Sequence, residues 1–230
     1  MATNNWGSKF SHVHMKHLAA FMTTYNMATQ TIAVDGTNVY NIQSTGTASC
    51  VINGVYIPAL TADAELLITS DEITTAWAAG TAYSADTTVY TGTAASSSVK
   101  YWKCLVAHTS TENTKPTDGD SNWQALPNLA GQELADDYRI LIMVTADADG
   151  TLGVWRASDD TAIGTAPTPD VPYFDPSVYC VVGWIDYAND AASAAVTFGD
   201  TDGGVDFGTD GTFYQQIGPV FPSVANLPKN

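Results

Sequence analysis

The chain has 230 residues, of which 45% are apolar, enough for one large domain or two small ones with a real hydrophobic core. Charged residues make up only 14%, and 24 acidic against 8 basic residues give a formal charge of −16. This charge argues against nucleic-acid binding, which uses Lys and Arg to displace counterions from phosphate. It also disfavours attachment to an anionic membrane surface.

The apolar residues are not arranged as a targeting or membrane segment. No stretch approaches the roughly 20 consecutive apolar residues of a transmembrane helix. His and Lys interrupt the apolar part of residues 1–21, which is atypical of a secretory signal peptide. We therefore expect neither a signal peptide nor a membrane span, and synthesis in a cytoplasm.

The three cysteines, Cys50, Cys104 and Cys180, lie far apart and have no CxxC spacing. An odd and sparse set is neither a disulfide framework nor a zinc site. The sequence predicts three buried thiols, with a Cys50–Cys180 disulfide as the alternative.

The first 34 residues contain no acidic side chain, so all 24 acidic residues follow them. Ser8 is a suitable N-cap for a helix that runs to about residue 25, with apolar side chains at i, i+3 and i+4 spacing on one face. This helix either packs on its own domain or docks on a partner, and Phe10, Leu18 and Phe21 are the candidate anchoring residues. A metal site at His12, His14 and His17 is the weaker alternative, since no carboxylate or cysteine accompanies them.

After residue 29 the apolar pattern changes to a period of two, which is typical of strands. Asn53-Gly54 predicts a two-residue hairpin turn between apolar runs, and residues 148–150 predict a second hairpin. The expected strands cover residues 30–34, 39–43, 49–57, 66–69, 138–145, 151–157, 177–187 and 195–198.

Residues 71–126 hold half of the six tryptophans and several tyrosines. The segment resembles the small chitin- and cellulose-binding modules of the family 5/12 type, and bacteriophage tail and appendage proteins also carry such modules. The resemblance rests on Trp77, Gly80, Thr81, Tyr83, Val89, Tyr101, Cys104, His108, Pro116 and Trp123.

In such modules exposed aromatic rings stack on sugars, so the resemblance implies glycan binding by some of four candidates: Trp77, Tyr83, Trp102 and Trp123. The alternative is that all these rings form the core of a tiny three-stranded fold. Tyr101 and Trp102 are neighbours and must point to opposite faces of a strand. We expect one of the two to be core and the other to be free for exposure.

No catalytic motif stands out, and His108 is the only histidine beyond the N-terminal segment. We expect a protein that is not an enzyme and has no cofactor. Hard cations need several oxygen ligands at once. Asp147–Gly150 is better explained as a turn, and the Gly-rich segment 199–211 offers only a weak Ca²⁺ candidate in Asp200, Asp202, Asp206 and Asp210.

The predicted fold is mainly β: an antiparallel, hairpin-rich and sandwich-like domain with an N-terminal α-helix and a small inserted three-stranded module. Its expected divisions are a helical attachment segment (1–28), a discontinuous β domain (29–70 with 127–200), the module (71–126) and an extended Gly/Asp/Pro-rich tail (201–230).

The two outer halves resemble, in style, bacteriophage virion proteins built of short Thr/Ala-rich hairpins. The resemblance implies a head decoration, head fibre or tail appendage subunit on the virion, with other virion proteins as partners and a homo-oligomer, a trimer by preference. Contact with host surface polysaccharide is a further expectation. The competing interpretation is a bacterial extracellular carbohydrate-binding protein.

Overall fold

The computed structural model describes residues 25–26, 32–44, 49–58, 60, 63–64, 73–93, 99–117, 120–170, 175, 177–190, 194–200, 202–215 and 218–219. Within these residues the protein is mainly β, with antiparallel sheets, as predicted. The described helices are the four-residue α2 (Phe207–Asp210) and a 3₁₀ turn, η3 (Glu112–Thr114). The predicted N-terminal helix, with Phe10, Leu18 and Phe21, lies outside the described residues, as does the predicted strand at 66–69.

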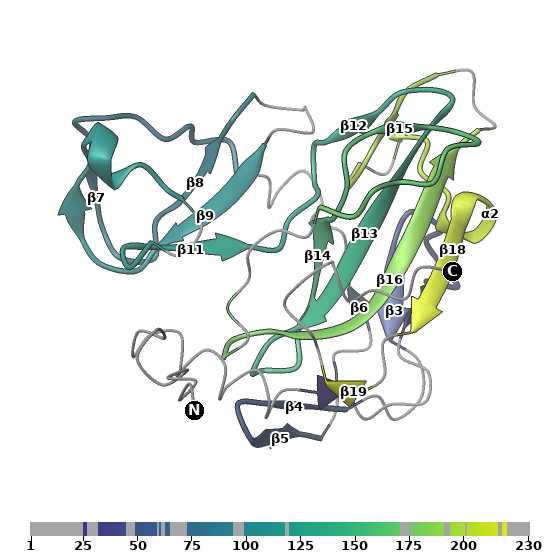
Figure 1. The fold of residues 1–230 in the computed structure, drawn as a ribbon, viewed down its shortest axis with the longest axis horizontal. Coiled ribbons are helices and arrows are strands. Elements are labelled where there is room, and N and C mark those ends of the chain that lie inside the picture. The colour runs from purple at the N-terminus through teal and green to yellow at the C-terminus, as the bar shows by residue number, and fades with distance from the viewer. Residues whose placement is uncertain are drawn as a thin grey trace, which may run out of the picture.

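A five-stranded antiparallel sheet, which we call the main sheet, forms the centre of the molecule (Figure 1). Its two long strands pair with each other along their whole length, with a bulge between Val144 and Thr145. Its strands are β13 (Tyr138–Ala146), β14 (Leu152–Arg156), β15 (Thr161–Ala162), β16 (Cys180–Asn189) and β18 (Gly211–Gln215).

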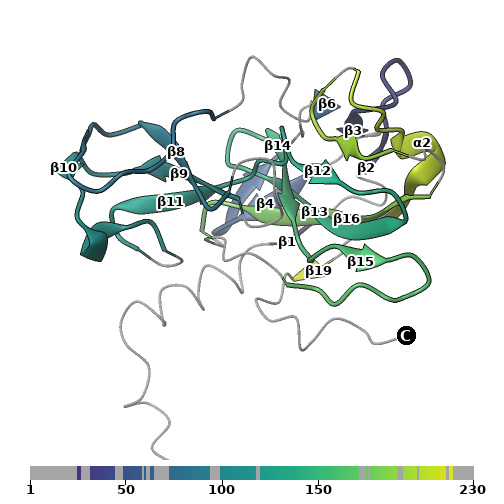
Figure 2. The same cartoon turned by 90° about the horizontal axis from the view of Figure 1, so that it is seen from above.

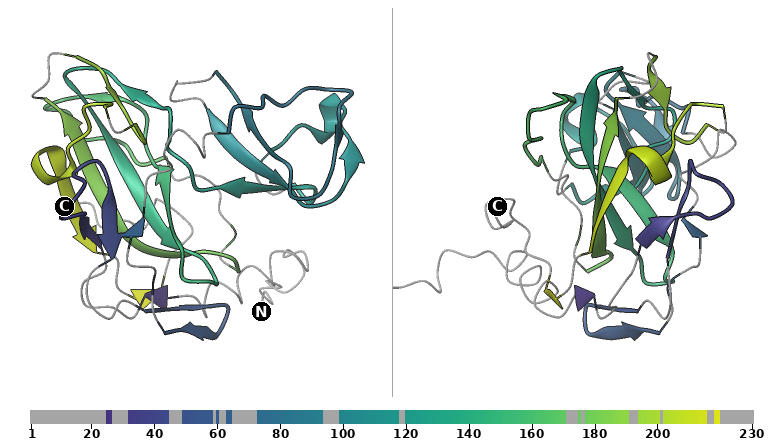
Figure 3. Two further views of the ribbon diagram at one scale, coloured as in Figure 1. Left: turned by 180° about the vertical axis from the view of Figure 1, so that it is seen from behind. Right: turned by 90° about the vertical axis from the view of Figure 1, so that its right-hand side faces the viewer.

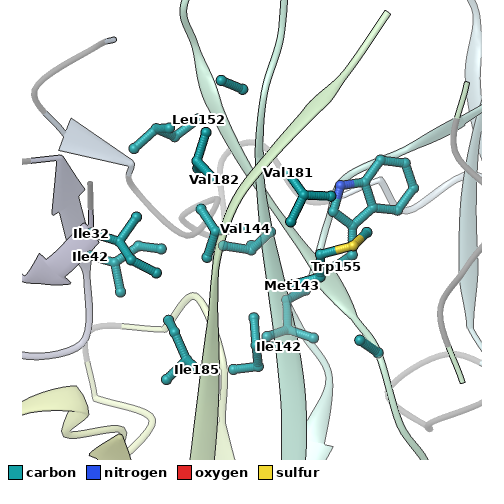
Figure 4. Close-up of a cluster of buried hydrophobic side chains, with 14 of the residues drawn as sticks. Ile32, Ile42, Ile142, Met143, Val144, Leu152, Trp155, Val181, Val182 and Ile185 are labelled. Carbon is teal, nitrogen blue, oxygen red and sulfur yellow. The ribbon is translucent and has the colours of Figure 1, made fainter. Parts of the chain in front are cut away.

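Both faces of the main sheet are buried at its centre, where β13, β14 and the first half of β16 lie (Figure 4). Ile32 and Ile42, on neighbouring strands of a second sheet, lie over one face. Met143 and Trp155 lie on the opposite face. Burial on both faces explains why β13 and β16 are near-continuous apolar runs, without the polar-apolar alternation of a half-exposed strand.

Short strands surround the main sheet in three small antiparallel sheets. The first has β1 (Tyr25–Asn26), β4 (Cys50–Ile52), β5 (Val55–Ile57) and β19 (Gly218–Pro219). The second has β2 (Ile32–Val34), β3 (Ile42–Ser44) and β6 (Asp63–Ala64), and the third has β12 (Glu133–Leu134) and β17 (Val196–Thr197).

Both predicted hairpins are confirmed. Asn53 and Gly54 join β4 to β5 with positive φ angles of 49° and 79°, the left-handed backbone that a two-residue turn of this type requires. Between β13 and β14 the Asp147 carboxylate accepts hydrogen bonds from the amides of Asp149 and Thr151, at 3.0 and 2.8 Å. Asp147 thus serves the turn.

Residues 202–215, the start of the predicted extended tail, are integrated into the β structure. Phe207 in α2 is fully buried in the large core, and the next strand, β18, pairs with β16. The sequence pattern missed this strand because Gly and Asp precede it and only Phe213 and Tyr214 carry a strand signal. Residues 220–230 lie outside the described residues.

The described residues of the segment 71–126 form a group of strands to one side of the main sheet, seen apart from it in Figures 1 and 2 and from behind in Figure 3. We call this group the module. Its three-stranded sheet has β8 (Thr88–Thr91), β9 (Lys100–Cys104) and β11 (Trp123–Leu126), and β7 (Ala82–Tyr83) pairs with β10 (His108–Thr109).

Candidate functional site

The module has its own small aromatic core. Tyr83, Val89, Trp102, Cys104 and Trp123 are buried together, each at most 5% exposed. The Trp123 ring meets Tyr83 edge-on, with ring centroids 5.2 Å apart. Three of the four glycan-binding candidates are therefore core residues.

The polar groups of these rings are also satisfied within the module. The Trp102 indole N–H donates to Thr91 Oγ1 at 2.8 Å, and that of Trp123 donates to the Thr114 carbonyl at 3.0 Å. The Tyr83 hydroxyl accepts from the Ala78 amide at 2.8 Å. This corrects the glycan-binding assignment of Tyr83, Trp102 and Trp123, because a buried ring has no face to offer to a sugar.

Trp77 differs from the other three candidates because its side chain is only half-buried. The Lys115 ammonium lies 5.6 Å from the centroid of its ring, at cation–π distance. Its indole N–H is buried and has no hydrogen-bond partner among the described residues. Trp77 alone cannot provide the row of ring faces that the resemblance implies.

The neighbouring residues Tyr101 and Trp102 do point to opposite sides, yet both are buried. Trp102 faces the module core, whereas the Tyr101 hydroxyl donates to the Ala130 carbonyl at 2.9 Å in the segment that leads to the main sheet. A second hydrogen bond joins the two parts, from Gln124 Nε2 to the Tyr179 hydroxyl at 3.2 Å. The side of β9 that carries Tyr101, which the sequence left free for exposure, therefore lies at a buried junction between the module and the main sheet.

A cavity of about 130 Å³ lies at this junction. Strands β9 and β11 of the module line one side, and the end of β14 with the residues after it lines the other. Its polar lining residues are Lys100, Asn128, Gln132, Arg156, Ser158, Asp159 and Asp170, and Tyr101, Trp102 and Trp155 are its aromatic ones. A single water needs only about 10–15 Å³ of such volume, so several water-sized groups fit.

Hydrogen bonds and an ion pair connect the inner polar residues of this cavity. Gln132, 1% exposed, accepts from Arg156 Nη1 at 3.2 Å and donates to the Asn128 carbonyl at 3.5 Å. The Arg156 side chain is 7% exposed and forms an ion pair with Asp160. Burial lowers the pKa of Arg156 to about 10, and the nearby Asp159 carboxylate opposes that shift. The guanidinium is therefore a buried cation held by partners from several segments.

Asn128 is the one member of this group with an unused polar atom. Its side-chain oxygen accepts from the Ala130 amide at 2.8 Å, which fixes the orientation of the amide group. Its Nδ2 is buried without a hydrogen-bond partner in the described part of the chain. None of these residues carries a sequence signal, because Asn128 and Gln132 lie in an ordinary connecting segment and Arg156 ends a strand.

Cys104 and His108 lie close together in the module, with Sγ 3.7 Å from Nδ1. Both groups contact the Val106 carbonyl, at 3.2 Å from the sulfur and 2.7 Å from the ring nitrogen. Burial raises the pKa of the Cys104 thiol, and Asp86 adds to the rise while the Val106 contact opposes it. This environment favours the thiol over the reactive thiolate.

The three thiols are buried, as predicted, and none is in a disulfide. The thiols of Cys50 on β4 and Cys180 on β16 nevertheless influence each other. Interaction with Cys180 lowers the pKa of Cys50, and interaction with Cys50, together with burial, raises the pKa of Cys180.

The acidic segment after residue 199 uses its carboxylates for local turns. Asp206 caps α2 by accepting from the amides of Gly208 and Thr209 at 2.8 and 3.0 Å, and Asp200 accepts from the Asp202 amide at 2.9 Å. The remaining Ca²⁺ candidate, Asp210, lies beside the Tyr187 hydroxyl at 3.4 Å. Among the described residues no three metal-ligating side chains converge.

Comparison of the chain with protein-family models, with curated proteins and with solved structures finds no match. No helix within the described residues combines the length and apolar character needed to cross a membrane.

Proposed function

We propose that the protein is a non-enzymatic structural component of a bacteriophage particle, displayed on its surface as a head decoration, head fibre or tail appendage subunit. The observation that carries the proposal is the separate aromatic core of the module beside the main sheet. A small fold held to one side of a larger one suits a protein that presents a binding element away from its point of attachment.

In this proposal each part of the chain has a role. Residues 1–28 are the attachment segment, whose helix ends before β1 and carries Phe10, Leu18 and Phe21 on its docking face, and residues 71–126 are the displayed part. The sandwich-like β domain connects the two. Two features of the sequence support this division: the similarity of the module to those of phage appendages, and the absence of acidic residues before Asp35.

The location is tested on particles purified from the phage that encodes the chain. We expect the protein among the particle proteins by mass spectrometry, and antibody against the module to label a fixed part of the particle. Its absence from purified particles would remove the proposal.

The assembly is tested by light scattering during gel filtration. A trimer of 24.3 kDa chains is the expected species. Removal of residues 1–24, which keeps β1, should abolish incorporation into particles while leaving the melting transition of the free protein within a few degrees. Incorporation of the truncated protein would contradict the anchoring role.

The second candidate is a bacterial extracellular carbohydrate-binding protein. The polar cavity at the junction favours it, since such a cavity suits a protein whose role is to bind a small polar ligand. Retention on chitin or cellulose together with absence from particles would select this candidate.

A further inference from the structure

The cavity between the module and the main sheet has the character of a built site. Hydrogen bonds connect its inner side chains, because Gln132 joins the Arg156 guanidinium to the Asn128 backbone. Buried polar networks of this kind are favourable only when each member finds a partner. The Asn128 Nδ2 donor is the member without one in the described part of the chain.

A buried donor without a partner in the described part of the chain calls for an oxygen acceptor in the cavity. The side-chain amide of Asn128 cannot flip to pair this donor, since its Oδ1 already accepts from the Ala130 amide at 2.8 Å. A hydroxyl or carbonyl oxygen in the cavity would complete the group, and the free energy lost by desolvating the donor would be recovered.

The rim of the cavity adds acceptors. Asp159 and Asp170 are exposed carboxylates from the segment after β14, on the side opposite the exposed Lys100 of β9. A ligand must therefore accept a hydrogen bond at Asn128 and donate hydrogen bonds to the carboxylates. Hydroxyl groups do both.

Charge and shape narrow the ligand further. The two rim carboxylates balance the charges of Lys100 and Arg156, so the lining carries no net positive charge, and together with the formal charge of −16 this opposes an anion such as a phosphate ester. Tyr101, which faces the junction, and Trp155 give the cavity an apolar wall beside its polar groups, which matches a sugar ring with both C–H and O–H groups. The volume of about 130 Å³ fits one sugar residue more readily than an extended oligosaccharide.

We infer that this junction cavity binds one neutral sugar residue of a surface glycan. Asn128 donates to a ring or hydroxyl oxygen, and Asp159 and Asp170 accept from hydroxyl groups. This inference rests on the proposed function of a displayed surface protein, and it places recognition at the junction instead of on the aromatic rings of the module.

The test uses the full chain with methyl glycosides of glucose, galactose, mannose and N-acetylglucosamine, measured one at a time by saturation-transfer NMR, with inorganic phosphate as the anionic probe. We expect at least one glycoside to bind and phosphate not to compete with it. Asp159→Asn and Asp170→Asn should each weaken that glycoside about fivefold to tenfold, because each loses a charge-assisted hydrogen bond.

The matched control is Asp149→Asn, which removes the same charge from an exposed turn residue that does not line the cavity. It should leave glycoside affinity unchanged. Asn128→Asp keeps the acceptor for the Ala130 amide and removes the Nδ2 donor, so binding should fall by more than tenfold. If Asn128→Asp does not fold, the two rim variants still decide the question.

Three results would overturn the inference: no glycoside binds, phosphate displaces the glycoside, or the rim variants bind as well as the control. Its failure is separable from that of the proposed function. Protein found on particles without glycoside binding rejects the cavity alone, whereas glycoside binding by a protein absent from particles rejects the virion role alone.

Discussion

The main sheet and the module each bury tryptophan by the same local device, but with different amounts of surrounding structure. Trp155 on β14 and Trp102 on β9 both donate their indole N–H to a threonine hydroxyl on the adjacent strand, at 2.8 Å in each case. The acceptors, Thr145 and Thr91, each lie two positions beyond the cross-strand partner of the tryptophan.

The surroundings of the two tryptophans differ greatly in size. Among the described residues the large core joins 27 buried side chains, and the module core joins five. A three-stranded sheet with so small a core has little stability of its own. The module therefore depends more than the main sheet on its junction, where Tyr101 and Gln124 make their hydrogen bonds to Ala130 and Tyr179.

The largest expected effect is that of Trp155→Ala. Trp155 is 4% exposed, and loss of a buried tryptophan costs about 3–5 kcal/mol of unfolding free energy. Because β13 pairs with both β14 and β16, hydrogen exchange should accelerate throughout the main sheet. The half-buried Trp184 provides the comparison, and Trp184→Ala should lower the unfolding free energy by less. Equal losses of unfolding free energy in the two variants would show that Trp155 contributes no more to the stability of the main sheet than Trp184 does.

Trp102→Ala should destabilise the module about as much as Trp155→Ala destabilises the main sheet, but fewer residues should be affected. Trp102 is 2% exposed, and its neighbours belong to the module core. We expect faster hydrogen exchange in residues 77–126 and near-native protection in β13 and β16. Equal acceleration in both regions would mean that the module and the main sheet unfold as one unit.

The strands and hairpins of both regions could be predicted from sequence, whereas the contacts between the regions could not, for a physical reason. The period-two pattern and the Asn53-Gly54 turn are local signals, and they gave the strands and hairpins. Whether Tyr101 faces solvent depends on the segment at Ala130, 29 residues away. No local pattern encodes that contact.

The junction cavity was beyond prediction for the same reason. Asn128, Gln132 and Arg156 become a group only when β14 and the connecting segment come together. The burial of the three module aromatics was open from sequence, because core tryptophan and sugar-binding tryptophan have the same spacing in a small β module. Strand β18 was missed because its place in the sheet is set by pairing with β16.

Gly183→Ala tests how closely the second sheet covers the main sheet. A Cβ at Gly183 would lie 2.5 Å from Ile32 Cδ1 and 2.9 Å from the Tyr214 carbonyl oxygen. Overpacking of this kind costs about 1–3 kcal/mol in thermal or urea unfolding. Ile32→Val removes the nearest atom, so the double variant should recover part of the loss.

The matched control for Gly183 is Gly36→Ala, because no atom lies within 4 Å of a Cβ at that position. It should leave the unfolding free energy nearly unchanged. If Gly183→Ala lowers the unfolding free energy as little as Gly36→Ala, the Ile32 side chain can move to accommodate the added methyl group and the two sheets are not tightly packed there.

The smallest expected effect is a loss of stability in alkali that depends on the junction. Burial, with a contribution from Asp147, raises the pKa of Tyr179 to about 12, whereas an unfolded tyrosine ionises near pH 10. Between about pH 10 and 12 the unfolded chain loses a proton that the native protein keeps, so stability falls as pH rises. At about pH 11 the loss of unfolding free energy from this group is roughly 1.4 kcal/mol.

The variant Tyr179→Phe tests this effect. It should lower the unfolding free energy at neutral pH, because the contact with Gln124 is lost, and it should reduce the fall in stability between about pH 10 and 12 in urea titrations. A slope equal to that of the unmodified protein would show that the phenol is open to water, and that the module does not seal this side of the main sheet.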